Sequence, residues 1–155
     1  MNYIKSTLYA GLLLCLFFLT ACGDGPEPVP ANVVNSTNGL RIDLEWTTGG
    51  TTSDAVNNSD LDLYLTKGGT EVSNSTSSGS FEVVRIQDVY ADGEYTIAVE
   101  AFNATKKTNY TLYVKGDDEG ELKPYTGEFL AGDRYLKVNF LKIKKAGSTY
   151  TITEY

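Results

Sequence analysis

The 155-residue chain contains no histidine and only two cysteines. Without histidine it lacks the commonest general base, the Ser-His-Asp and Cys-His catalytic groups, and any zinc site built on imidazole. It also has no serine followed by lysine three positions later and no glycine-rich phosphate loop. Paired carboxylates support glycoside hydrolysis in other proteins. Because twenty Asp and Glu residues make some close pair inevitable, such a pair is no evidence of catalysis. The sequence therefore predicts a protein that is not an enzyme.

Both cysteines lie near the amino terminus. Cys15 is inside the apolar run 8-LYAGLLLCLFFL-19, and Cys22 comes three residues after that run ends. A membrane-spanning helix needs about 20 apolar residues, so this shorter run indicates a removable secretory signal peptide over residues 1–21. Removal of that segment leaves one cysteine and therefore no intramolecular disulfide.

The stretch 19-LTAC-22 resembles the lipobox of bacterial lipoproteins, with a leucine, a small hydroxyl residue, an alanine and the cysteine in order. The resemblance implies cleavage before Cys22, a diacylglycerol on its sulfur and an acyl chain such as palmitate on its new amino group. Two or more acyl chains hold a protein stably on a membrane. We therefore expect lipidation of Cys22 and a place on the outer membrane, on its periplasmic or its exposed side. The alternative is an ordinary signal peptide followed by a chance cysteine.

The mature chain is acidic. Without Lys5, twelve Lys and Arg residues face twenty Asp and Glu residues, a net charge of −8. This charge argues against nucleic acid as a partner and against charge-driven binding to anionic lipids. Three of the four prolines lie in residues 22–32, which we expect to form a semi-rigid tether. Asp24 and Glu27 are either an export signal of the kind found in Bacteroidota-like lipoproteins or ordinary solvated residues of that tether.

From Val33 to the end, apolar and polar residues alternate in short stretches separated by Gly, Asn, Asp and Ser. Alternation with a period of two is typical of strands with one buried face, and it places Trp46 in the core. Pro124 predicts an edge strand, and a shift of phase at Phe140 predicts a β-bulge. The expected strands are 40–46, 60–66, 81–89, 94–102, 108–114, 121–129, 135–145 and 149–155.

These strands predict an all-β domain over residues 33–155, an antiparallel, jelly-roll-like β-sandwich of seven to eight strands. No stretch of the mature chain shows sustained helical periodicity. The outward rings of Tyr64 and Tyr113 are either platforms for sugars or ordinary cross-strand packing.

Four stretches resemble the bacterial pre-peptidase C-terminal (PPC) type of β-sandwich: 40-LRIDLEW-46, 60-DLDLYL-65, 93-GEYTIAVEAF-102 and 109-NYTLYV-114. The resemblance spans about half of the chain, and the last 40 or so residues depart from it. It implies a jelly-roll-like accessory domain that is generally non-catalytic, sometimes calcium-binding and sometimes attached to a secreted hydrolase.

Asp60 and Asp62 are the candidate metal ligands. Carboxylates two residues apart on a strand point the same way, about 6 to 7 Å from each other, and calcium prefers several oxygen ligands. Asp54 precedes them and is a third candidate donor. The alternative interpretation is the solvent-facing side of an ordinary strand.

The function expected from these features is that of a non-catalytic envelope lipoprotein, a binding or accessory subunit displayed from the outer membrane. Its partner would be an envelope protein or a glycan. The alternatives are a calcium-dependent or carbohydrate-binding module and a small carboxylate-based hydrolase or inhibitor.

Overall fold

The computed structural model describes residues 30–117, 120 and 122–155. Within them the chain forms ten strands and one short helix, and no helix there is long and apolar enough to cross a membrane. The predicted signal peptide, Cys22 and most of the predicted tether lie outside the described residues. In chain order the elements are β1 (Val33–Asn35), β2 (Gly39–Thr47), α1 (Thr52–Asn58), β3 (Ser59–Lys67), β4 (Thr70–Ser75), β5 (Phe81–Gln87), β6 (Gly93–Ala104), β7 (Thr108–Gly116), β8 (Lys123–Phe129), β9 (Leu136–Ala146) and β10 (Thr149–Glu154).

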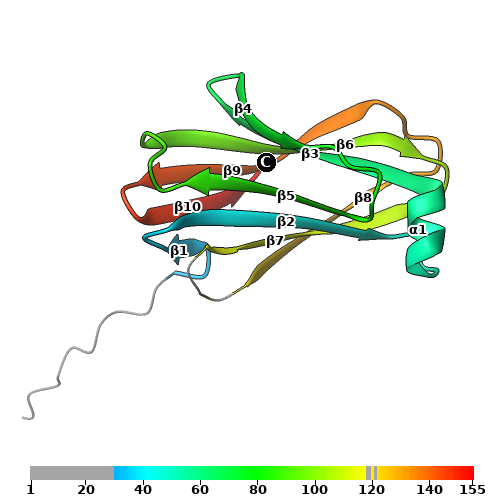
Figure 1. The fold of residues 1–155 in the computed structure, drawn as a ribbon, viewed down its shortest axis with the longest axis horizontal. Coiled ribbons are helices and arrows are strands. Elements are labelled where there is room, and N and C mark those ends of the chain that lie inside the picture. Colours follow the sequence, from blue (N-terminus) through cyan, green and yellow to red (C-terminus); the bar gives the residue numbers. More distant parts are fainter. Residues whose placement is uncertain (1–29, 118–119, 121) are drawn as a thin grey trace, which may run out of the picture.

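The strands form two antiparallel sheets with a shared core. The six-stranded sheet has the order β1-β10-β9-β6-β3-β4, and the four-stranded sheet has the order β5-β2-β7-β8. Figure 1 shows the long strands running side by side, with α1 at one end of the sandwich. The predicted all-β sandwich is confirmed. It has two strands more than the eight expected, because β1 is only three residues long and the polar sequence of β4 carries no apolar alternation.

The core is built from the alternating positions. The longer strands, such as β3, β6 and β7, send alternate side chains inward, where the two sheets exclude water from them. The prediction that Trp46 is buried is confirmed, since its exposed fraction is 6%. Fully buried side chains on β2, β3 and β7 include Leu40, Ile42, Leu44, Leu61, Leu63, Leu65, Leu112 and Val114.

Two local predictions on the last strands are confirmed. Ile97 pairs with Leu141 and Ala98 pairs with Asn139, so Phe140 is the extra residue of a bulge in β9. Pro124 lies in β8, the edge strand of the four-stranded sheet, where a missing amide donor breaks no ladder.

Helix α1 forms in the polar segment before Asp60, where the sequence shows no helical periodicity. Thr51 caps the helix by accepting a hydrogen bond from the amide of Asp54 at 3.2 Å. Ala55 is the one buried residue among the seven of the helix. Two turns with a single buried side chain give no repeating apolar pattern, and for this reason the sequence did not reveal the helix.

Candidate functional site

Asp60 and Asp62 lie on the side of β3 opposite its buried leucines, on the outer face of the six-stranded sheet. The register pairs Asp62 with Glu100 of β6, and Glu100 with Lys137 of β9. A hollow of about 390 Å³ opens at this place on the face. We call it the acidic hollow, and it is lined by Asp60, Asp62, Tyr64, Thr76, Glu100, Phe102 and Tyr135.

Arg134 lies over the ring of Tyr135, 4.9 Å from its centre. The only cation placed against a carboxylate of the acidic hollow among the described residues is Lys137. Its Nζ lies 3.1 Å from Oε2 of Glu100 and 3.2 Å from the centre of the Tyr64 ring. Asp60 and Asp62 form no ion pair with any residue that the structure describes. The hollow therefore holds more negative charge than its own lysine neutralises.

The protonation of Asp62 reflects this surplus of negative charge. Asp62 is only 6% exposed, and burial, reinforced by the charge of Asp60, raises its pKa from 3.8 to about 6. The Tyr64 hydroxyl donates a hydrogen bond to Oδ2 of Asp62 at 3.3 Å, which opposes part of that rise. Near neutral pH, Asp62 is thus a carboxylate whose charge its surroundings poorly solvate.

Asp60 adds a second unsatisfied group. Burial, followed by the charge of Glu82, raises its pKa. Its Oδ1 is buried and has no hydrogen-bond partner in the described part of the chain. Glu82 differs, because it accepts hydrogen bonds from the amide and the hydroxyl of Ser77 at 2.8 and 2.6 Å. Buried polar atoms are usually paired, so the unpaired oxygen of Asp60 is an exception in this fold.

Two aromatic rings form the other side of the acidic hollow. Asp60 pairs with Asn103 and Leu61 with Ala101, so Phe102 is the extra residue of a bulge in β6. The Phe102 ring meets the Tyr135 ring edge to face, with 5.1 Å between their centres. Tyr135 has a φ of 54°, the one positive value outside glycine among the described residues. Strained backbone of this kind is concentrated at functional sites.

Asp54 does not join Asp60 and Asp62 in the acidic hollow. It lies in α1 and accepts hydrogen bonds from Nζ of Lys106 at 2.6 Å and from Oγ1 of Thr48 at 2.5 Å. The bond from Lys106 is the main reason why the pKa of Asp54 is lowered. No group of three or more Asp, Glu, His or Cys side chains in the described ranges is arranged to hold a metal ion. The structure therefore brings together two of the three predicted calcium ligands.

Sequence reasoning missed Glu100, Phe102, Tyr135 and Lys137. The alternation of residues 94–102 places Glu100 on the outward face of its strand, so the sequence could have identified it. The positions of the other three depend on the bulge in β6 and on the pairing of β6 with β9, neither of which is local in the chain.

The chain is an all-β sandwich with an acidic, partly aromatic hollow on the outer face of one sheet. Comparison with known proteins finds no matching family model, no similar curated protein and no similar solved structure. We therefore base the proposed function on the chemistry of the acidic hollow.

Proposed function

We propose that the protein is a non-catalytic envelope lipoprotein, anchored to the outer membrane through Cys22, which binds a basic segment of an envelope partner in the acidic hollow. The observation that carries the proposal is the state of Asp62, which is 6% exposed and has no cationic partner among the described residues. An unpaired buried charge is unfavourable, and a cation brought by a partner relieves that cost.

The rings of the acidic hollow suit the same partner. Lys137 already lies over the face of Tyr64, which is how an ammonium or guanidinium group binds an aromatic ring. Arg134 lies over Tyr135 in the same way, 4.9 Å from the ring centre, and Phe102 offers a further ring beside the carboxylates. A lysine or arginine side chain of a partner fits this combination of charge and aromatic surface better than an anion or a nucleic acid does.

Crosslinking followed by pull-down from native membranes tests the proposal. We expect the wild-type chain to capture an envelope protein, and we expect the triple variant Asp60→Asn, Asp62→Asn, Glu100→Gln to lose it. A matched control carries Asp88→Asn, Glu94→Gln and Glu128→Gln, which remove equal charge from exposed positions outside the acidic hollow. Equal capture by both triple variants would contradict the proposal.

Cys22 lies outside the described residues, and its lipidation has a separate test. Cys22→Ser should abolish labelling with a radioactive fatty acid and release the domain into the soluble fraction. The reason is that acyl chains supply most of the membrane affinity of an anchored domain. Persistence of the variant in membranes after a carbonate wash would show that another part of the chain holds it there.

For calcium we predict no specific effect. Only two of the expected carboxylate ligands meet in the acidic hollow, and calcium usually takes six to eight oxygens. Millimolar calcium and magnesium should therefore change the melting temperature equally. A true site would stabilise the fold by about 2.7 kcal/mol at a hundredfold excess over the dissociation constant. A calcium-specific rise that disappears in Asp60→Asn, Asp62→Asn would establish the site instead.

A further inference from the structure

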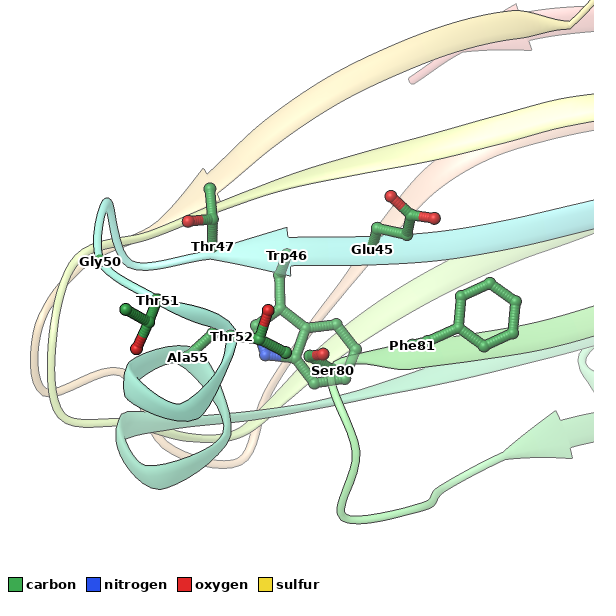
Figure 2. A pocket seen from close by; sticks show the side chains of 9 residues that line it. All are labelled: Glu45, Trp46, Thr47, Gly50, Thr51, Thr52, Ala55, Ser80 and Phe81. Carbon is green, nitrogen blue, oxygen red and sulfur yellow. The ribbon is translucent and has the colours of Figure 1, made fainter.

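A second hollow lies where β2 ends beside α1 and the start of β5. It has a volume of about 270 Å³, and we call it the Trp46 pocket. Figure 2 shows its lining, which includes Trp46, Thr52, Ala55, Ser80 and Phe81. None of these residues belongs to the acidic hollow, so the two sites are separate.

The indole of Trp46 contains a polar atom without a partner. Its Nε1 is buried and finds no hydrogen-bond acceptor among the residues that the structure describes. In Figure 2 the nitrogen edge of the ring is turned toward α1, where Thr52 and Ala55 line the pocket. A buried donor without an acceptor costs about 1–3 kcal/mol. Because an indole N–H can only donate, a partner for it has to be an acceptor atom such as an oxygen.

Two hydroxyl groups beside the indole are also free. The hydroxyls of Thr52 and Ser80 make no hydrogen bond to other described residues, and both side chains line the pocket with Trp46 (Figure 2). Thr51, by contrast, already uses its hydroxyl to accept from the amide of Asp54. A hydroxyl both donates and accepts, so the Trp46 pocket offers one fixed donor and two adaptable groups.

The charge and size of the pocket restrict the ligand further. No lysine or arginine is among its described lining residues, and the carboxylate of Glu45 points to the side of β2 opposite Trp46 (Figure 2). Phe81 adds an apolar ring that is 41% exposed. Pockets for drug-sized ligands measure about 300–1,000 Å³, so this smaller one suits a single ring.

We infer that the Trp46 pocket binds one neutral sugar residue of a glycan. A sugar supplies acceptor oxygens for Nε1 of Trp46, hydroxyls for Thr52 and Ser80, and an apolar C–H face for Phe81. Because Nε1 is buried, this binding requires side chains beside α1 to move aside for the entering oxygen. This inference goes beyond the proposed partner binding, because it concerns another site and an uncharged ligand.

Trp46 is the only tryptophan of the chain, so its fluorescence reports on the pocket directly. The probes are the methyl glycosides of glucose, mannose and N-acetylglucosamine, titrated into the wild-type protein. We expect a saturable change in emission with at least one of them. Phe81→Ala and Thr52→Val should each weaken binding about tenfold, which corresponds to the loss of one contact. The matched control is Phe102→Ala, since Phe102 is also 41% exposed but lies in the acidic hollow.

Calorimetry with Trp46→Phe tests the indole nitrogen itself. This variant keeps an aromatic ring but lacks the donor, and it should remain folded and bind the sugar about tenfold more weakly. Unchanged affinity, or no saturable signal with any of the three glycosides in the wild type, would overturn the inference. Loss of sugar binding in Phe102→Ala alone would also overturn it by moving the site to the acidic hollow. The acidic triple variant should bind the sugar normally, so failure here and failure of the proposed partner binding are distinguishable.

Discussion

Asp62→Asn should make the protein more stable at neutral pH. Burial and the charge of Asp60 raise the pKa of Asp62 to about 6 in the folded state, against 3.8 as the ordinary value. The unfolded chain therefore loses this proton more readily. The contribution of Asp62 to the free energy of unfolding is fully present below pH 3.8. It is lost as the pH rises through about 6. At about 1.4 kcal/mol for each pKa unit, the expected gain from the neutral amide is about 3 kcal/mol above that range.

Urea unfolding between pH 3.5 and pH 8 measures the effect. The two proteins should be equally stable at the acid end and should diverge as Asp62 ionises. Asp92→Asn is a control that should lower the stability at neutral pH. Asp92 accepts hydrogen bonds from Nζ of the buried Lys145 at 3.0 Å and from the amide of Gly147. Those bonds lower the pKa of Asp92, so its contribution is present at neutral pH and is lost on acidification. Equal curves for wild type and Asp62→Asn would show that Asp62 is well solvated.

Gly39→Ala should destabilise the protein by about 3 kcal/mol or more, through backbone strain and a steric collision. Gly39 has a φ of 103°, and an added Cβ would lie 2.5 Å from the carbonyl oxygen of Ile86 in β5. The carbonyl of Gly39 also accepts hydrogen bonds from the Ser36 hydroxyl at 2.5 Å and from the amide of Asp117 at 3.0 Å. The backbone is thus held from several sides and cannot move away.

Gly132→Ala separates the two causes. Gly132 has a φ of 98°, close to that of Gly39, but a Cβ there meets no atom within 4 Å. Its cost should be that of the left-handed backbone alone, about 1–2 kcal/mol. Thermal or urea unfolding of the two variants gives the difference due to contact with Ile86. Equal losses would mean that β2 and β5 adjust their spacing without cost.

The features of this fold that could be predicted are those that depend on residues close together in the sequence. The inward leucines of β2 and β3 follow from alternation, and the bulge at Phe140 follows from one change of phase. The acidic hollow was predictable only as the shared direction of Asp60 and Asp62. Its other walls come from Glu100 and Tyr135, which reach Asp62 through the register of three strands and the bulge at Phe102. Long-range pairing of this kind leaves no periodic signal in the sequence.

One outer strand of each sheet, β1 or β8, limits self-association. An exposed strand edge can recruit a second chain, and proteins prevent this with short or proline-containing edge strands. Here β1 has three residues and β8 contains Pro124, so one edge of each sheet is a poor template for a neighbour. At high concentration, copies of this domain can therefore lie side by side without forming shared sheets through those two edges.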